Sequence, residues 1–354
     1  MTMMYSESNE IVQNDLKKLN AFCSMLGKDP LLVQGAGGNV SFKNDDVLWI
    51  KASGTQIFDA LERNIFVPVN LKKLHIELEK GNFAASPQTL GDIDLRPSIE
   101  TLLHALLPYK FVFHLHAIEP LAHLVRDGVR DQLPCLMGFL SNWICVDYFK
   151  PGADLANAIA KELKSCPNAE IIFMINHGIV VGADSIEGIS KTLDHVIKLT
   201  TIEPYFHEDA ALPPADEKLT ELRYRPCIDR GINQLAQNDS MFRKLKTSWA
   251  LYPDHLVFLG AYPAILGVTL SLCELFKLDK KPSYIFVPRI GVYEHETVTA
   301  AQHAQLRCYF DVLSRQHESQ DLVTLNEKEV EDILNWDSEH YRQNQILGAN
   351  AQKI

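Results

Sequence analysis

The sequence has few features of a secreted, membrane-bound or nucleic-acid-binding protein. Its 7 cysteines are an odd number without a CxxC pair, which argues against a disulfide framework and favours a reducing compartment. The net charge of −11 lacks the basic excess that attracts a phosphate backbone. No apolar run approaches the roughly 20 residues that span a bilayer, and the start, MTMMYSESNE, does not read as a signal peptide. We therefore expect a cytoplasmic protein without nucleic-acid or membrane partners.

The composition is that of a packed protein with more than one domain. Hydrophobic residues make up 46% of the 354 positions, and the length exceeds that of one average domain. The stretch PYFHEDAALPPADEK (204–218) is rich in Pro, acid and Ala, and it predicts a boundary there. We expect one domain over residues 1–205 and a C-terminal α/β extension over residues 206–354.

Strand-like and helix-like segments alternate along the chain, which predicts an α/β or α+β fold. Glycine 27 should end an amphipathic helix over residues 9–26. Further helices are predicted over 154–165, with Asp154 as the N-cap, and after Ser185. In the extension we expect strands over 254–266 and 283–293, and helices over 299–316 and 326–347.

Two histidines stand one residue apart in the apolar run KFVFHLHAIEP, residues 110–120. Successive side chains on a strand point to opposite faces, so His114 and His116 share one face while Phe113 and Leu115 fill the other. Two imidazoles at this spacing can bind one ion. Zinc needs three or four ligands, however, so a pair of hydrogen-bonded core histidines is an equal alternative.

A third candidate ligand is His177 in INHGIVVG, at the end of an apolar strand. The glycine after it, Gly178, lets the backbone turn so that the ring can face inward. Taken alone, His177 is more typical of a turn residue. Three histidines together would leave an open coordination position, which is the pattern of a catalytic zinc rather than a structural one.

An acidic residue, Glu100, lies in RPSIETLLHALL, on a helix predicted over residues 98–108. On such a helix His104 follows one turn later on the same face. A carboxylate beside a bound cation can either ligate it or act as a base. The alternative is an ordinary glutamate in the first turn of a helix, favoured by the helix dipole.

The loop QGAGGNVSF offers backbone amides at Gly35, Gly37 and Gly38 that could hold an anion. It is not a dinucleotide fingerprint, because Val40 stands at the third glycine and a strand follows where that motif needs a helix. A second loop, KASGTQ, brings Ser53 and Gly54 to the end of the next strand pair. Two such loops could hold a phosphate or carboxylate between them, although each alone reads as a plain turn.

Five segments occur in the order found in one known family: GAGGNVS, IKASG, PSIETLLHALL, FHLHA and INHGIVVGAD. Over roughly residues 10–205 the chain resembles the class II aldolase and adducin family, with the fold of fuculose-phosphate aldolase. The amino-acid sequence of these segments is most similar to that of the aldolase part of the rhamnulose-phosphate aldolase/dehydrogenase proteins. The resemblance implies a three-layer α/β/α fold around a mainly antiparallel sheet, with a smaller α/β C-terminal region.

The resemblance also implies a role for each matching residue. The metal ligands would be His114, His116 and His177, with Zn²⁺ as the cofactor or another divalent metal in its place. Glu100 would be the catalytic acid or base. The substrate or its phosphate would be held by matching loop positions, namely Gly38, Asn39, Ser53, Gly54 and Ser98.

The function implied is a carbon–carbon lyase that acts on a sugar or sugar-phosphate through an enediolate stabilised by zinc. A homo-oligomer, by resemblance a tetramer, is expected. Alternatives are a decarboxylase or dehydratase on the same fold, or a non-catalytic module like adducin. Glu100 and the three histidines favour the enzyme.

The sequence departs from the family at two positions. Ala36 and Ile99 stand where the sugar-phosphate aldolases have a threonine and a serine. Each change removes a hydroxyl donor, so we expect weaker binding of a phosphorylated substrate. Beyond residue 215 the sequence contains no cluster of His, Cys or acid at ligand spacing. We expect that region to shape the mouth of the site or an oligomer contact and to hold no cofactor.

Overall fold

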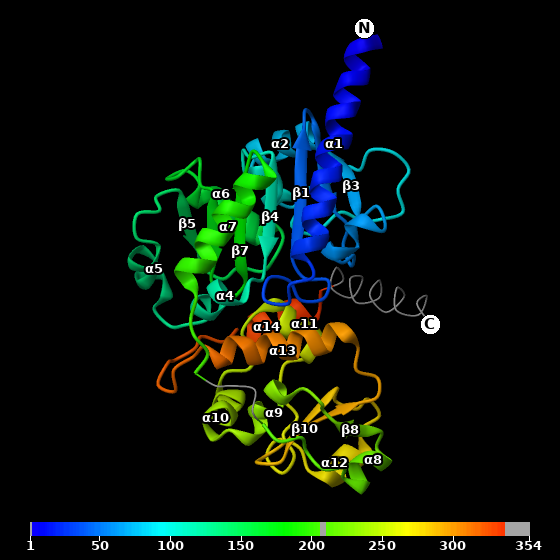
Figure 1. Ribbon diagram of the computed structural model, residues 1–354, viewed down its shortest axis with the longest axis vertical. Helices are drawn as coiled ribbons and strands as arrows, with labels where there is room; N and C mark the ends of the chain where they lie inside the picture. The colour runs from blue at the N-terminus through cyan, green and yellow to red at the C-terminus, as the bar shows by residue number, and fades with distance from the viewer. Residues whose placement is uncertain (1, 206–209, 337–354) are drawn as a thin grey trace.

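The computed structural model describes residues 2–205 and 210–336, and a seven-stranded sheet is the centre of its larger part (Figure 1). The strand order is β3-β2-β1-β4-β7-β6-β5, and every neighbouring pair is antiparallel except β5 and β6. This arrangement confirms the predicted mainly antiparallel α/β fold. The strands are β1 (Asn39–Asn44), β2 (Val47–Lys51), β3 (Phe66–Asn70), β4 (Phe111–Leu115), β5 (Trp143–Val146), β6 (Ile171–Met174) and β7 (Gly178–Ala183).

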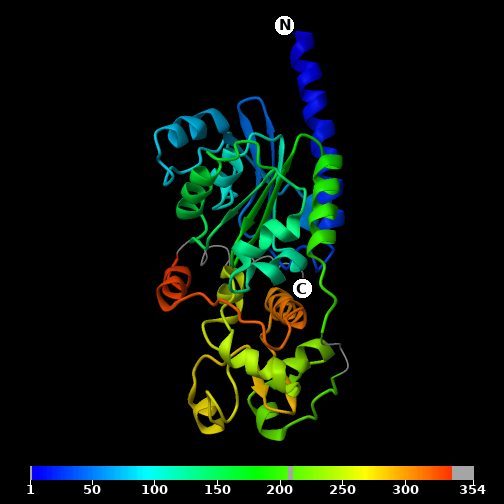
Figure 2. The ribbon, with the colours of Figure 1, turned by 90° about the vertical axis from the view of Figure 1, so that its left-hand side faces the viewer.

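Helices cover both faces of the sheet and make the three layers visible in Figure 2. Phe113 and Leu115 of β4 pack on one face with α1, α5 and α7, whereas Val112 packs on the other face with α3 and α6. The alternation of buried side chains along β4 therefore separates two cores. The helices are α1 (Thr2–Leu26), η1 (Ile57–Leu61, 3₁₀), α2 (Leu71–Glu79), α3 (Thr101–Leu106), α4 (Ile118–Leu124), α5 (Val129–Met137), α6 (Ala153–Glu162) and α7 (Ile186–Thr200).

The C-terminal part is built around a smaller antiparallel sheet of order β8-β10-β9. In Figure 1, α11, α13 and α14 lie between this small sheet and the large sheet. Ala36, Ile118 and Leu121 share a hydrophobic core with the C-terminal helices, so the two parts are packed together. The elements are α8 (Glu217–Glu221), β8 (Tyr224–Pro226), α9 (Arg230–Gln237), α10 (Asp239–Thr247), α11 (Pro253–Leu259), α12 (Leu272–Lys277), β9 (Tyr284–Val287), β10 (Gly291–His295), α13 (Ala300–Ser314) and α14 (Glu327–Leu334).

Several predicted helix ends are confirmed by their caps. The side chain of Ser185 accepts a hydrogen bond from the Gly188 backbone N–H at the start of α7. Thr299 and Gln302 form a capping box at the start of α13. Helix α1 ends at Leu26, and a Cβ at Gly27 would stand 2.6 Å from the Phe58 backbone nitrogen, so glycine is required at this approach.

Other predictions need correction. Residues 253–259 form helix α11 instead of the strand predicted from 254 onward, because Pro253 opens the helix and all but its last residue are buried. Segment 283–293, predicted as one strand, comprises β9 and the beginning of β10, which pair with each other. Asp154 lies in the first turn of α6, whose N-cap is Gly152. The predicted helix from 326 is described as far as Leu334, and its residues from 337 onward lie outside the described part.

No helix within the described ranges is long and apolar enough to cross a membrane. The predicted boundary at residues 205 and 206 stays a prediction, since 206–209 lie outside the described residues. Helix α13 nonetheless packs against α4, and Glu119 of α4 forms a buried ion pair with Arg315 just after α13.

Candidate metal centre

Three histidines meet at the end of strand β4. His114 lies in the strand opposite Val180 of β7, His116 follows the strand, and His177 directly precedes β7. The ring centroids are 4.8 Å apart for His114–His116 and His114–His177, and 5.5 Å apart for His116–His177. All three residues are buried, and one nitrogen from each lies within 4.8 Å of the others. The antiparallel pairing of β4 with β7 is what joins the two sequence motifs.

The turn before β7 directs His177 inward. Asn176 adopts the left-handed conformation with φ of 54°, and its side-chain amide donates 2.8 Å hydrogen bonds to the carbonyls of Leu251 and Val323. A Cβ at Gly178 would stand 2.5 Å from the Leu115 carbonyl oxygen. Glycine is therefore needed for β7 to approach β4 at this point.

The three imidazoles fit a divalent cation. His114 Nδ1 lies 3.0 Å from the Ile179 carbonyl and must donate a hydrogen bond to it. In the neutral ring Nε2 then carries a lone pair that can bind a metal. His114 Nε2 and His116 Nε2 face each other at 3.0 Å. Desolvation by burial lowers the pKa of His114 and brings the pKa of His177 to about 3, so both rings are neutral. Neutral nitrogen ligands in a buried cluster suit Zn²⁺ better than Mg²⁺ or Ca²⁺.

Glu100 lies beside these ligands, directly before α3 rather than within it as predicted, and acts as the N-cap residue of that helix. Its Oε2 is 3.5 Å from His114 Nε2, and its Oε1 is 3.6 Å from His177 Nε2. Burial by itself would raise the pKa of Glu100, but the positive charge that His114 and His177 acquire at low pH and the hydrogen bond from the Asn39 amide outweigh this and hold the pKa at about 2. The carboxylate is therefore ionised at neutral pH.

A chain of hydrogen bonds orients Glu100. The Asn39 amide nitrogen donates to Glu100 Oε2 over 2.6 Å, and Asn39 Oδ1 accepts from His104 Nε2. This fixes the tautomer of His104, so its Nδ1 accepts from the Ser41 hydroxyl at 2.8 Å. The predicted helix placed His104 on the same face as Glu100. The sequence did not predict the contact of His104 with Ser41 or its connection to Glu100 through the Asn39 amide. Ser41 follows Asn39 by two positions on β1, a spacing that could have suggested a shared face.

Every residue assigned to the site from the sequence lines one narrow cavity. These are Gly38, Asn39, Ser53, Gly54, Ser98, Glu100, His114, His116 and His177. The side chain of Asn39 is engaged with Glu100 and His104, and Ser98 Oγ accepts from the Glu100 backbone N–H at 3.2 Å. Lys51, which the sequence analysis missed, adds a buried cation to the lining. The individual roles of these residues stay predictions.

A further acid in the cavity comes from the C-terminal part. Asp254, in the first turn of α11, is 3% exposed, and its Oδ2 lies 3.3 Å from His116 Nδ1. Asp254 was not predicted from the sequence, because the run DHLVF was interpreted as a strand and lies far along the chain from the histidine motifs. Only the packing of α11 against the large-sheet part places this carboxylate in the site.

The extension also contains a cluster that the sequence analysis did not expect. Cys227, Glu294 and His303 offer ligand atoms within 4.8 Å of one another. The carboxylates of Asp229 and Glu294, 3.7 Å and 3.8 Å from the ring nitrogens of His303, raise its pKa to about 9, so this ring is a cation at neutral pH. Arg225 also pairs with Glu294, at 2.9 Å. The carboxylates here are neutralised by protein cations, so this cluster is an ion-pair network.

Comparison with known proteins identifies the N-terminal half. The profile of a family described as the Class II Aldolase and Adducin N-terminal domain matches residues 17–202. A curated relative from Bacillus subtilis (strain 168), named uncharacterized oxidoreductase YuxG, is 29% identical over 180 residues. That match covers 46% of this chain and 26% of the relative, so the chain spans about a quarter of the relative's length.

Solved structures that resemble the chain each cover about half of it. The N-terminal class II aldolase domain of a conserved Thermoplasma acidophilum protein is 24% identical with a TM-score of 0.44, covering 52% of this chain and 92% of that one. A sugar-phosphate aldolase from Thermotoga maritima is 13% identical with a TM-score of 0.44, covering 53% of this chain and 93% of that one.

Proposed function

Because the chain belongs to the class II aldolase and adducin family, we propose that it is a metal-dependent lyase that cleaves or forms a carbon–carbon bond in a sugar or sugar-phosphate. The observation that carries this proposal is the position of Glu100. An ionised, buried carboxylate lies 3.5 Å and 3.6 Å from the Nε2 atoms of His114 and His177. Convergent ligands next to a base, inside one cavity, are the arrangement expected of a catalytic site.

The metal in this proposal is Zn²⁺, or another divalent cation, held by His114, His116 and His177. Bound there, it would act as a Lewis acid that stabilises negative charge developing on a substrate oxygen. The buried Oε1 of Glu100 and Nδ1 of His177 have no hydrogen-bond partner among the described residues, so the site has polar atoms for a ligand to satisfy.

Glu100 would move the proton. Its Oε2 is held by the Asn39 amide at 2.6 Å, whereas Oε1 has no hydrogen-bond partner among the described residues. Oε1 is thus the atom free to take a proton from a substrate carbon next to a carbonyl and later return it. The Ser41–His104–Asn39 chain keeps the carboxylate in one orientation, which reduces the reorganisation needed during the reaction.

Polar groups in the same cavity would hold the polar tail of the substrate. Ser53, Gly54 and Ser98 line it, and Lys51 supplies a positive charge. Ala36 and Ile99 line the same cavity without hydroxyl groups. We therefore expect this cavity to bind a phosphorylated sugar more weakly than it would with hydroxyl groups at these two positions. By resemblance to the family we also propose a homo-oligomer in the cytoplasm.

The proposed base can be tested with Glu100→Gln, which keeps the side-chain shape and removes the proton acceptor. The half-reaction to follow is exchange of the carbon-bound protons of dihydroxyacetone, and of its phosphate, in D₂O by proton NMR. We expect wild type to catalyse exchange and the variant to be slower by roughly 10²–10⁴-fold, with its bound metal retained.

Glu187→Gln is the matched control, because Glu187 is an exposed first-turn glutamate of α7 that does not line the cavity. It should exchange at the wild-type rate. Normal exchange by Glu100→Gln would assign the proton to another group. Loss of metal from Glu100→Gln would make Glu100 a ligand instead of the base.

A further inference from the structure

A carboxylate from outside the matched family segment reaches the metal centre. Asp254 belongs to α11, beyond the match that ends at residue 202. Its Oδ2 lies 3.3 Å from His116 Nδ1, close enough for an ion pair although not aligned as a hydrogen bond. The opposite ring atom, His116 Nε2, faces His114 Nε2 at 3.0 Å. The His116 ring therefore lies between Asp254 and the other ligands.

Close packing fixes Asp254 in this place. A Cβ at Gly37 would stand 2.8 Å from Asp254 Oδ2 and 3.1 Å from His116 Nδ1, so Gly37 leaves the space that the pair occupies. From α13, the Gln305 amide donates to Asp254 Oδ2 at 3.4 Å. The extension touches the site a second time, because the carbonyls of Leu251 and Val323 hold the Asn176 amide next to His177.

We propose that Asp254 is a positioning residue for His116, so that the C-terminal extension is part of the metal centre. This inference rests on the proposed function, since it requires a metal at the three histidines. Metal-ligating histidines usually give their second ring N–H to a carboxylate or carbonyl, which fixes the tautomer and orients the ring. Here His114 uses the Ile179 carbonyl, and Asp254 is the corresponding partner of His116.

The test is the metal affinity of Asp254→Asn in the full chain, measured by competition with a chromophoric zinc chelator. Loss of such a partner weakens metal binding by roughly 10–100-fold, and we expect that range. Asp239→Asn is the matched control, because Asp239 is also a first-turn aspartate but is exposed. The visible spectrum of the Co²⁺-substituted protein should change for Asp254→Asn and not for Asp239→Asn.

Gly37→Ala perturbs the same contact from the other side and should also weaken Zn²⁺ binding. It keeps the proposal testable if Asp254→Asn fails to fold. Zinc binding by both variants equal to that of Asp239→Asn would overturn the inference while leaving the proposed function intact. If wild type itself binds neither Zn²⁺ nor Co²⁺, the proposed function fails first.

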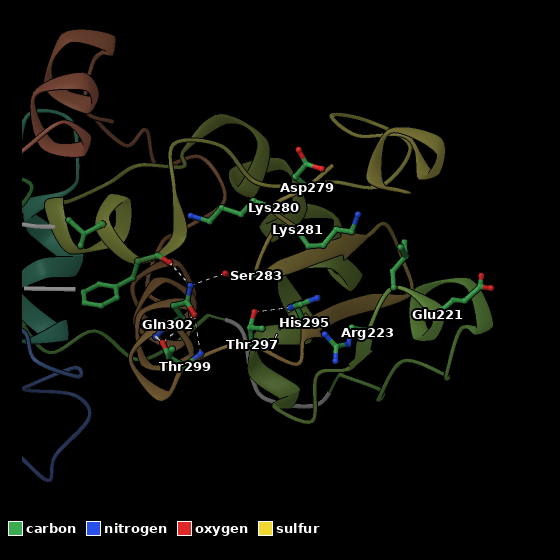
Figure 3. Close-up of a pocket in the computed structure, with 13 residues that line it drawn as sticks. Glu221, Arg223, Asp279, Lys280, Lys281, Ser283, His295, Thr297, Thr299 and Gln302 are labelled. Carbon is green, nitrogen blue, oxygen red and sulfur yellow. Dashed lines mark hydrogen bonds between the residues drawn. The ribbon is translucent and has the colours of Figure 1, made fainter. Parts of the chain in front are cut away.

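A separate cavity of about 620 Å³ lies in the extension, at the other end of α11 (Figure 3). Val257 and Phe258 form an apolar wall, and the segment 279–283, the end of β10 and the start of α13 supply polar groups. Figure 3 shows His295 and Thr297 in the middle of the labelled side chains, with Glu221 and Asp279 at the edges. The cavity shares no lining residue with the metal site.

The hydrogen-bond pattern leaves donors for a ligand. The Thr297 backbone N–H donates to His295 Nδ1 at 3.3 Å, so in the neutral ring the hydrogen is on Nε2. Desolvation by burial lowers the pKa of His295, which keeps the ring neutral at pH 7. The Gln302 amide donates to Ser283 Oγ at 2.8 Å, which leaves the Ser283 hydroxyl hydrogen free to donate.

Two lysines give the cavity positive charge. Lys281 Nζ donates to the carbonyls of Leu275, Leu278 and Phe276 at the end of α12, and these neutral groups do not cancel its charge. Among the described residues, neither Lys280 nor Lys281 forms an ion pair with a carboxylate. The lining contains three cations, Arg223, Lys280 and Lys281, against two acids, Glu221 and Asp279, so the cavity is positive within a chain of net charge −11.

We infer that this cavity binds a small organic anion, a carboxylate or a phosphate ester. Its charged group would meet Lys280, Ser283 and His295 Nε2–H, and its carbon skeleton would lie on Val257 and Phe258. The volume suits a small metabolite, since ligand pockets typically measure about 300–1,000 Å³. This site is independent of the proposed lyase activity.

Isothermal titration calorimetry with inorganic phosphate and with malonate distinguishes the two anion classes. We expect at least one of them to bind wild type, and the double variant Lys280→Ala/His295→Ala to bind it at least tenfold more weakly. Lys218→Ala removes an exposed lysine outside the cavity and should bind as wild type does. Equal binding by the double variant and Lys218→Ala, or no binding of either anion to wild type, would overturn the inference.

Discussion

At the scale of single residues, histidine is neutral in one part of this molecule and positively charged in another. Burial holds the pKa of His104 and His177 at about 3, so these rings are neutral and His177 can offer a lone pair. His303 has a pKa of about 9, because the nearby carboxylates of Asp229 and Glu294 favour the charged form. A histidine cluster becomes a candidate metal site when its surroundings are dry and its rings are neutral.

We expect His177→Ala to lose bound metal, because the variant keeps two of three nitrogen ligands. Removing a hydrogen-bond partner of a ligand costs roughly 10–100-fold in metal affinity, and removing the ligand itself should cost more. Metal content after dialysis, measured by plasma emission spectroscopy, is the readout. His195→Ala, at an exposed position of α7, should keep the wild-type content. Full occupancy in His177→Ala would remove His177 from the site.

At the scale of elements, α11 connects the two sites described above. Its first turn carries Asp254 toward His116, and Val257 and Phe258 in its last turn form a wall of the anion cavity. The helix has only seven residues, so it spans about 10 Å at 1.5 Å per residue. Pro253 at its start fixes the backbone entry, and the Gly260 N–H closes its end on the Leu256 carbonyl.

At the scale of the whole molecule, the N-terminal and C-terminal parts are joined by packing and by a buried ion pair. Arg315 donates to Glu119 Oε1 through Nε at 3.0 Å and Nη2 at 2.7 Å, and Glu119 Oε2 accepts from the Ile202 backbone N–H at 3.0 Å. Arg126 also donates to the Arg315 carbonyl at 2.9 Å. These contacts hold α13 on α4 and so fix the position from which α11 reaches the metal site.

We expect Glu119→Gln to destabilise the protein by about 3–5 kcal/mol, because it leaves the Arg315 charge buried without its partner. Asp147→Asn breaks an exposed pair with Arg130 and should cost about 0–1 kcal/mol. Chemical denaturation followed by circular dichroism gives both values. A cost for Glu119→Gln no larger than that for Asp147→Asn would show that this pair does not hold the two parts together.

The sequence by itself determined the local features of the site. The alternation of side chains on a strand places His114 on one face and Phe113 and Leu115 on the other. The packing of Phe113 and Leu115 in one core and of Val112 in another confirms this alternation along β4. The order of the five motifs predicted the family and the mainly antiparallel sheet, and both are confirmed. These inferences succeed because they depend on backbone periodicity and on neighbours close in the chain.

Only the tertiary structure decided how distant segments complete the site. No spacing in the sequence relates Asp254 to His116 or Ser41 to His104, because each contact depends on how separate elements pack. The same reason explains the error at α11, where a short apolar run fits a strand and a buried helix equally well. Burial on every side, which chooses between them, is a property of the assembled fold.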